Sequence, residues 1–435
     1  MKKFLALLVT GVLALSLFGC TEPKDGLDSI PEYTEDKTFM IGGWSEPPAT
    51  NKAYSYIKEA GLDFIFLGQT YAGMGSEKYF ELLDYMNEIG LKAMLQTGSG
   101  QANQGVFDQE TDYSKYPAVY GLNYWDEPFF AQLDAVRELG QWHKQKYGNT
   151  DVKFYINMNP FYDKLGGDYN EYVESVSDII DEVGGVKTLS VDIYPLLTDI
   201  DGSSVSQSWL SNLEDVAIAA RDHEMDIFHT FILSVKHLSY RETSEKDFRY
   251  QLWVSMAYGC NSASYFIYAG RANNGWGSSL VDVSGEPELA YYDAQKVNAE
   301  IHAIDDIYMS FDWEGVYPVT GSETDEYSLF DGESVYYMNL EHSLESLDKI
   351  SSVTATQDTL VGQFHDKDGN KGYVVTNFSD PYDELDDKVV LNFKDVNRAI
   401  VCRGGERKVY QIENNKLELD LGAGEGAFVI PFWLN

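Results

Sequence analysis

The sequence has few of the features that point to disulfides, membrane spans or nucleic acid binding. It contains 3 cysteines among 435 residues, and after residue 20 no apolar run is long enough to span a bilayer. Only 32 Lys and Arg stand against 70 Asp and Glu, which gives a formal net charge of -38. A chain this acidic argues against nucleic acid as a partner and disfavours polyanionic ligands.

Motifs for several kinds of enzyme are also absent. There is no Gly-x-Ser-x-Gly turn of the kind that presents a serine nucleophile. No His, Cys and Asp residues cluster at metal-binding spacings, so we expect neither a metal nor a cofactor. Cys260 and Cys402 lie far apart in the sequence, which favours two buried free thiols over a disulfide.

The first twenty residues are typical of an export signal. Lys2 and Lys3 precede an apolar stretch, Phe4–Leu17, that is too short for a comfortable transmembrane helix and ends at Cys20. This resembles a bacterial lipoprotein signal peptide, 1–20, in which Cys20 is lipidated; an ordinary signal peptide with a chance cysteine is the alternative. Residues 21–37 are polar and carry prolines, as a tether would. We therefore expect a secreted protein that its lipid anchors to the bacterial cell membrane or cell surface.

Residues 38–312 alternate β-rich runs with amphipathic helical stretches. The helical stretches Ser76–Ile89, Phe129–Tyr147, Tyr169–Val183 and Thr243–Tyr258 each stop just before a glycine, which is a common helix end signal. Eight such strand and helix units predict a (β/α)₈ TIM barrel, with a doubly wound open sheet as the alternative. The expected strands are Phe39–Trp44, Leu62–Gly68, Leu91–Thr97, Val119–Trp125, Val152–Asn157, Leu189–Tyr194, Asp226–Leu233 and Ser262–Tyr268.

The open sheet would need a glycine-rich phosphate loop after its first strand. The segment there is Gly42-Gly43-Trp44-Ser45-Glu46-Pro47-Pro48, and its prolines exclude that helix start.

Residues 313–435 lose the helical spacing and show short alternating runs separated by turns. The turn signal Asp366-Lys367-Asp368-Gly369 predicts a hairpin. We expect a small antiparallel β-sandwich following the barrel. Its expected strands are Leu360–His365, Gly372–Asn377, Lys388–Phe393, Arg407–Ile412, Leu417–Leu421 and Gly426–Pro431.

The segment Val119-Tyr120-Gly121-Leu122-Asn123-Tyr124-Trp125-Asp126-Glu127-Pro128 is the most informative in the chain. It predicts a buried strand that ends in two carboxylates, after which Pro128 suits the first turn of a helix. In a TIM barrel the carboxyl ends of the strands carry the functional groups, so Asp126 and Glu127 are expected at the barrel mouth. Trp125 offers an apolar plate for a sugar ring. Both acids also have a structural interpretation, Asp126 as a helix N-cap and Glu127 as a helix-start residue.

Other strand ends are expected to converge on the same mouth. The expected substrate-binding residues are Trp44, Tyr71, Gln96, Trp125, Asn157, Tyr194, His229 and Tyr268. His229 also suits a structural role inside the barrel. Asp192 lies in an otherwise apolar strand, where a buried aspartate needs either a Lys or Arg partner or a role in a site. Tyr194, two residues on, would point the same way as Asp192.

This set of residues suits the cleavage of glycosidic bonds. Such cleavage normally needs one carboxylic acid to protonate the leaving oxygen and a second carboxylate as nucleophile or base. Glu127 is the expected acid, with its pKa raised by burial. If Asp192 is the second catalytic group, its carboxyl should face Glu127 across the mouth; otherwise Asp126 carries the second role.

The chain resembles the clan A glycoside hydrolases of β-galactosidase and cellulase type. Residues 120–128 are similar to that clan's fourth strand, which ends in Asn-Glu or Asp-Glu, and the resemblance makes Glu127 the acid/base. The stretches 248–268, 361–364 and 422–425 resemble the last barrel unit and the C-terminal β domain of β-galactosidase-like proteins.

The chain departs from that clan at the seventh strand, where the clan places its nucleophilic glutamate. The run 226–234 contains no glutamate. Some N-acetylhexosaminidases also carry an adjacent Asp-Glu pair at the fourth strand, and in them the substrate's own acetamido oxygen attacks. We therefore expect a cell-surface glycoside hydrolase acting on an oligosaccharide or polysaccharide. The alternatives are a substrate-assisted N-acetylhexosaminidase using Asp126 and Glu127, or a non-catalytic glycan-binding lipoprotein.

Overall fold

The computed structural model describes residues 33, 37–68, 77–96, 110–161, 165–198, 204–271, 275–324, 328–330, 338 and 340–433. The expected signal peptide with Cys20, nearly all of the tether, and Tyr71 lie outside these residues. Within them, no helix has the length and apolar character needed to cross a membrane. Cys260 and Cys402 are both buried and unpaired, as expected.

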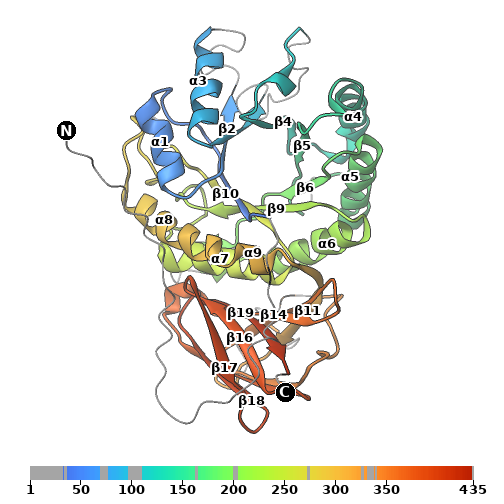
Figure 1. The fold of residues 1–435 in the computed structure, drawn as a ribbon, viewed down its shortest axis with the longest axis vertical. Helices are drawn as coiled ribbons and strands as arrows, with labels where there is room; N and C mark the ends of the chain where they lie inside the picture. Colours follow the sequence, from blue (N-terminus) through green and yellow to red (C-terminus); the bar gives the residue numbers. More distant parts are fainter. Residues whose placement is uncertain are drawn as a thin grey trace, which may run out of the picture.

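Eight parallel strands close into a barrel, as the alternating pattern predicts (Figure 1). The strands are β1 (Met40–Gly43), β2 (Phe64–Gly68), β3 (Lys92–Gln96), β4 (Val119–Asp126), β5 (Lys153–Asn157), β6 (Thr188–Val191), β9 (Ile227–Leu233) and β10 (Ser262–Phe266). β1 pairs with β10, and a parallel bridge between Met158 and Val191 joins the β5 side to β6. This closure excludes the open sheet.

Helices surround the barrel. They are α1 (Asn51–Glu59), α3 (Glu77–Glu88), α4 (Leu133–Tyr147), α5 (Tyr169–Val183), α6 (Trp209–Asp222), α7 (Glu245–Ala257), α8 (Leu289–His302) and α9 (Asp305–Tyr308). Local chemistry sets the helix ends. α5, for example, begins where Asp168 accepts a hydrogen bond from the Glu171 backbone and stops at Gly184, whose φ of 73° suits glycine. The short strands β7 (Leu196–Leu197) and β8 (Ser204–Val205) lie in the loop after β6.

Two antiparallel sheets form the expected sandwich. One has the order β11-β13-β14-β19-β16-β17 and the other β12-β15-β18. Their facing apolar side chains make a second core, and in β18 every other residue is buried, as a strand with one solvated face requires. The strands are β11 (Phe311–Val319), β12 (Ile350–Thr354), β13 (Thr359–Asp366), β14 (Lys371–Asn377), β15 (Asp387–Phe393), β16 (Arg398–Arg403), β17 (Glu406–Gln411), β18 (Lys416–Leu421) and β19 (Gly426–Phe432).

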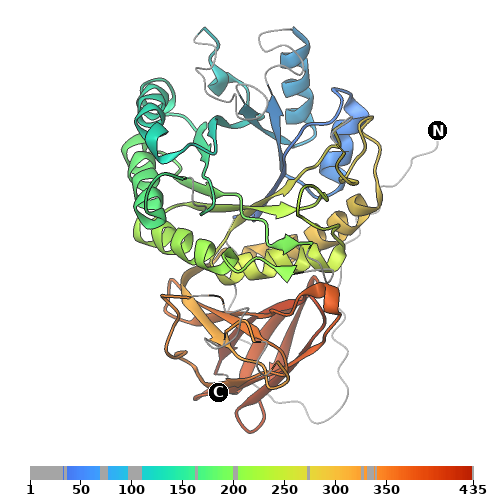
Figure 2. The same ribbon diagram turned by 180° about the vertical axis from the view of Figure 1, so that it is seen from behind.

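Helix α7 lies between the barrel and the sandwich (Figures 1 and 2). All residues from Asp247 to Ala257 are buried, because one side of α7 packs on the barrel and the other on β13, β14 and β19. The contact is close enough to require glycine on the sandwich side. A Cβ on Gly362 would lie 2.2 Å from the Ala257 carbonyl oxygen.

We expect Gly362→Ala to destabilise the protein by about 1–3 kcal/mol, because the added methyl group forces two packed backbones apart. Urea unfolding should show a lower midpoint. Gly422→Ala is the matched control, since the nearest atom to its Cβ would be Glu425 Cδ at 3.4 Å, an ordinary contact with a flexible side chain. Equal midpoints for the two variants would contradict this account of the junction.

Candidate active site

A β-bulge in β4 decides which of its last residues face the barrel mouth. The register between β4 and β5 shifts between Asn123 and Trp125. Tyr124 and Trp125 consequently both pack toward the helices. The Tyr124 hydroxyl lies 2.9 Å from His143 Nδ1 on α4, and Trp125 is 7% exposed within the main core. Asp126 then turns inward.

A chain of hydrogen bonds fixes Asp126 inside the barrel. Asn157 Nδ2 donates to Asp126 Oδ1 over 3.3 Å, and Ser190 Oγ donates to Asn157 Oδ1 over 2.9 Å. The Tyr155 hydroxyl lies 2.6 Å from Ser190 Oγ. Because these residues come from the adjacent strands β4, β5 and β6, the network ties the position of Asp126 to the barrel itself.

Glu127 has an unusual backbone conformation. Its φ of 54° is in the left-handed region, which costs a residue with a side chain about 1–2 kcal/mol. Its backbone N–H donates to the Asn157 carbonyl over 2.8 Å, which holds this conformation. Backbone strain of this kind persists where the surrounding structure imposes a particular side-chain direction, and it gathers at functional sites.

The carboxyl groups of Glu127 and Asp192 lie within hydrogen-bonding range of each other, so they can share a proton. Asp192 directly follows β6, so the two residues reach the mouth from separate strands. Asp192 Oδ1 is buried without a hydrogen-bond partner among the described residues, and the Tyr194 hydroxyl lies 3.5 Å from Oδ2, a long contact. Among the described residues, Asp192 is therefore held by a carboxyl and a phenol, and none of their Lys or Arg side chains forms an ion pair with it.

Asp126, Glu127 and Asp192 lie close together and are largely shielded from water, and we call them the carboxyl cluster. Both conditions favour the protonated form of a carboxyl group. Burial, and then the charges of Glu127 and Asp126, raise the pKa of Asp192 well above its ordinary range. Burial also raises the pKa of Glu127, and its hydrogen bond with Asp192 opposes that rise. Burial and the charge of Glu127 raise the pKa of Asp126 to about 7, against the opposing effects of Asn157 and Arg271.

We expect Asp126→Asn to stabilise the fold above pH 7. A pKa raised from 3.8 to about 7 on folding means that the ionised aspartate destabilises the folded state at high pH. The contribution of the Asp126 side chain to folding stability is most favourable below the unfolded pKa and is lost as the pH rises toward the folded pKa of about 7. Since one pKa unit corresponds to about 1.4 kcal/mol, the gain at pH 8 is at most about 4 kcal/mol.

Thermal unfolding at pH 4 and pH 8 measures this difference. The gain should fall below about 1 kcal/mol at pH 4, which lies close to the unfolded pKa of 3.8, because the folded aspartate is then protonated and the unfolded one is only partly ionised. Asp84→Asn, at an exposed position of α3, is the control and should change neither value. An Asp126→Asn variant less stable than wild type at pH 8 would contradict the electrostatic account.

Aromatic rings line one side of the carboxyl cluster. Tyr194 packs against Tyr240 and Phe266, with ring centroids 5.4 and 5.2 Å apart. His237 lies 4.7 Å from the half-buried Trp276. Burial, and then the charges of Asp192 and Glu127, raise the pKa of Tyr240, so this ring lies close enough to both acids to feel their charges. We call these five residues the aromatic wall; only Tyr194 among them is expected from the sequence.

Glu46 and Arg271 are two further charged groups near the carboxyl cluster. The Gly68 backbone N–H donates to the Glu46 carboxylate, and a Cβ on Gly68 would lie 3.0 Å from Glu46 Oε1. Burial raises the pKa of Glu46, whereas the charge of Arg271 acts on both Glu46 and Asp126 in the opposite direction. Glu46 was not predicted, although it follows the first strand as a carboxylate at a strand end.

Several expected substrate-binding residues are placed away from open space. Trp44 is 6% exposed and packs on Phe66 inside the barrel, with ring centroids 4.5 Å apart. His229 is 1% exposed, with Nδ1 2.8 Å from Ser262 Oγ, and burial lowers its pKa to about 3. Tyr268 is fully buried in the main core and, like Trp125, does not line the mouth.

Gln96 lies in the barrel interior beside an unpredicted amide. It is opposite Asn123 in the register of β3 and β4, and the two are 5% and 0% exposed. Gln96 Nε2 and both amide atoms of Asn123 have no hydrogen-bond partner among the described residues. Buried amides need such partners, so this pair offers hydrogen bonds to a ligand hydroxyl or an ordered water.

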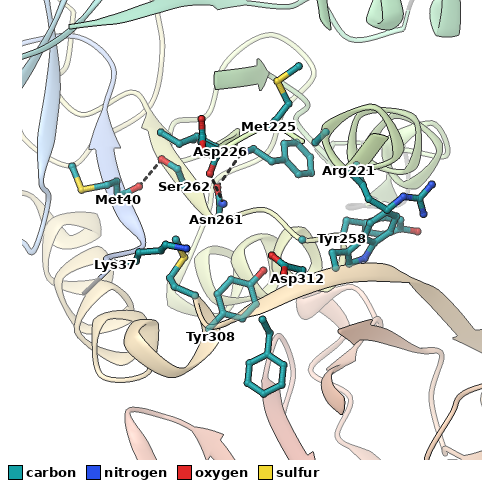
Figure 3. Close-up of a pocket in the computed structure, with 18 of the residues that line it drawn as sticks. Lys37, Met40, Arg221, Met225, Asp226, Tyr258, Asn261, Ser262, Tyr308 and Asp312 are labelled. Carbon is teal, nitrogen blue, oxygen red and sulfur yellow. Dashed lines mark hydrogen bonds between the residues drawn. The ribbon is translucent and has the colours of Figure 1, made fainter. Parts of the chain in front are cut away.

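A cavity of about 890 Å³ lies at the opposite end of the barrel (Figure 3). It is lined at the strand starts by Met40 and Ser262, which a 2.8 Å hydrogen bond joins, by Tyr308 at the end of α9, and by Asp312 of β11. None of the carboxyl cluster lines it. Since the functional groups of TIM barrels gather at the carboxyl ends of the strands, we place the candidate site at the mouth.

No protein-family model matches the sequence, and no curated protein matches it. A GH42 β-galactosidase from G. stearothermophilus shares the fold, with a TM-score of 0.53 and 11% identity over 92% of this chain and 99% of the enzyme. A candidate α-galactosidase from Bacteroides fragilis NCTC 9343 aligns with a TM-score of 0.51 and 10% identity over 91% and 79%.

A β-galactosidase from the psychrophilic Marinomonas ef1 aligns with a TM-score of 0.46 and 12% identity over 63% of this chain and 62% of its own length, so the chain spans less than two thirds of that enzyme. The expected resemblance to β-galactosidase-type proteins is thus confirmed in fold: the chain has the TIM barrel and trailing β domain of solved galactosidase structures.

Proposed function

We propose that the chain is a glycoside hydrolase that cleaves O-glycosidic bonds at the barrel mouth. The observation that carries the proposal is the hydrogen-bonded carboxyl pair of Glu127 and Asp192, delivered by the ends of two barrel strands beside Asp126. The aromatic wall adjoins this pair and offers rings on which a sugar can stack.

The pair supplies both groups that the reaction needs. The proposed reaction needs one proton and one negative charge on the pair, as an acid and a carboxylate must hold together. In the proposed reaction the proton passes from Asp192 to Glu127 along their hydrogen bond. Glu127 then protonates the leaving oxygen while the ionised Asp192 attacks the sugar carbon or takes a proton from water. Glu127 thereby keeps the general acid role that its sequence context predicts.

The two carboxyls are too close for this reaction without substrate. Direct hydrogen bonding is shorter than the roughly 5–5.5 Å of retaining enzymes and the roughly 6.5–9.5 Å of inverting ones. A sugar must therefore enter between Glu127 and Asp192 and separate them. Each acid would exchange the hydrogen bond to its neighbour for one to the substrate.

Substrate assistance is a second candidate because β9 offers no carboxylate. Its residues Ile227–Leu233 contain neither Asp nor Glu, so the position of the clan A nucleophile is empty of acid. Asp126 lies in the same cluster and could orient a 2-acetamido group while Glu127 protonates the leaving oxygen. This mechanism restricts cleavage to 2-acetamido sugars.

A screen of nitrophenyl glycosides and natural oligosaccharides tests the proposal. Release of nitrophenol or of new reducing ends by the wild-type protein is expected for at least one sugar. Hydrolysis confined to 2-acetamido sugars would select substrate assistance. Glycan binding without any turnover across the panel would overturn the proposal and favour the non-catalytic glycan-binding protein.

A further inference from the structure

The loop between β9 and α7 supplies two rings of the aromatic wall, His237 and Tyr240. It is paired with the segment that follows Asp192 and Tyr194. The Thr198 backbone N–H donates to the Ser239 carbonyl over 2.7 Å, and the Arg241 N–H donates to the Leu196 carbonyl over 3.2 Å. The position of this loop therefore sets one side of the mouth.

The end of the loop is held by Arg241, which is 7% exposed. Arg241 Nη2 lies 2.7 Å from Asp247 Oδ1 on α7 and 2.7 Å from Asp380 Oδ1 on the sandwich. Asp247 also accepts hydrogen bonds from the Ser244 backbone and hydroxyl over 2.8 Å. Asp380 also accepts one from the Tyr382 backbone over 3.0 Å.

Asp247 and Asp380 are thus each held in place by hydrogen bonds within their own segment, independently of Arg241. One guanidinium nitrogen joins the mouth loop, the interface helix and the short helix η6 (Pro381–Asp383) that Asp380 caps. Removing one partner of a buried ion pair destabilises the structure, because the remaining charge stays desolvated and has lost its compensating charge. Removing the charge of Asp380 therefore weakens the attachment of the loop without touching the mouth.

We propose that Asp380 is a positioning residue for the mouth: through Arg241, the β-sandwich holds the loop that carries His237 and Tyr240. The sandwich then contributes to sugar binding, although none of its residues forms part of the carboxyl cluster or the aromatic wall. The effect on sugar binding rests on the proposed function, whereas the effect on the loop does not.

Asp380→Asn tests the proposal, because the amide keeps the size of the side chain and can still accept from Tyr382. Glu384→Gln is the matched control. Glu384 follows the same short helix and pairs with Lys246 of α7 at 3.0 Å, but it is 74% exposed. Hydrogen–deuterium exchange of residues 235–242 should rise in Asp380→Asn and stay at the wild-type level in Glu384→Gln. For a glycan that wild type hydrolyses, KM should rise on the order of tenfold with kcat within about twofold.

Unchanged exchange of 235–242 in Asp380→Asn would overturn the proposal, even if the melting temperature fell. Faster exchange with unchanged KM would confine Asp380 to a structural role and would also overturn it. If no glycan is hydrolysed by wild type, the proposed function fails while the exchange result still decides whether the loop is held. Should Asp380→Asn not fold, Arg241→Lys, which reaches one acid instead of two, gives the same two readouts.

Discussion

Glu127→Gln should lower kcat/KM on a natural oligosaccharide by about 10²–10⁴-fold, the range expected when a general acid is lost. The amide keeps the shape of the side chain and its place beside Asp192 but cannot donate a proton to the leaving oxygen. A dinitrophenyl glycoside of the same sugar has a leaving group that departs without protonation, so its hydrolysis should fall much less. Initial rates on the two substrates measure the difference.

Glu242→Gln is the control for charge at the rim of the mouth. Glu242 is an exposed carboxylate next to Gly277, on the same loop as His237 and Tyr240. It should leave both rates within about twofold of wild type, because exposed charges outside the reacting pair contribute little. Equal losses on both substrates in Glu127→Gln would remove Glu127 from the role of general acid.

Asp192→Asn should abolish turnover on both kinds of substrate, with a loss of at least about 10³-fold in kcat. The reason is that a nucleophile or base is needed whatever the leaving group is. Added formate or azide should restore part of the rate on the dinitrophenyl glycoside by entering the space of the lost carboxylate. Rates with and without the added anion check both parts of the prediction.

Full activity in Asp192→Asn would contradict this role. It would leave the adjacent pair of Asp126 and Glu127 to carry the reaction, and 2-acetamido sugars should then be the only substrates cleaved. Tyr194→Phe serves as the control for local packing, since its hydroxyl makes only a 3.5 Å contact with Asp192.

Much of the barrel was predictable because its signals are local. The eight strands are β-rich runs, and helices such as α5 end at a glycine that the chain can use in the left-handed region. α1, α6 and α8 were not singled out, nor were β11, β12 and β16 in the sandwich. The helix α7 was predicted, but its burial on both sides was not, because that depends on the sandwich packing against it.

The site was predictable as far as the strand-end rule reaches. That rule located Asp126, Glu127, Asn157, Asp192 and Tyr194, which the structure brings together. It could not show that a bulge turns Trp125 toward the helices, since one extra residue reverses the side of every residue after it.

The remaining mouth residues depend on contacts between distant loops. His237 and Tyr240 follow the seventh barrel strand and pack on Tyr194 from the sixth, whereas Trp276 follows the eighth strand and packs on His237. No spacing in the sequence marks such a meeting. The proposed role of Asp380 also cannot be predicted from a local pattern, because it depends on a contact with Arg241, which is distant in the sequence.

The central claim is that the Glu127 and Asp192 pair cleaves a glycosidic bond. The most direct test is the double variant Glu127→Gln/Asp192→Asn on the glycan that wild type hydrolyses, with turnover and binding affinity measured on the same preparation. We predict that release of reducing ends is lost while Kd stays within about tenfold, because the two amides keep the shape of the mouth. Reducing ends released at the wild-type rate would contradict the claim.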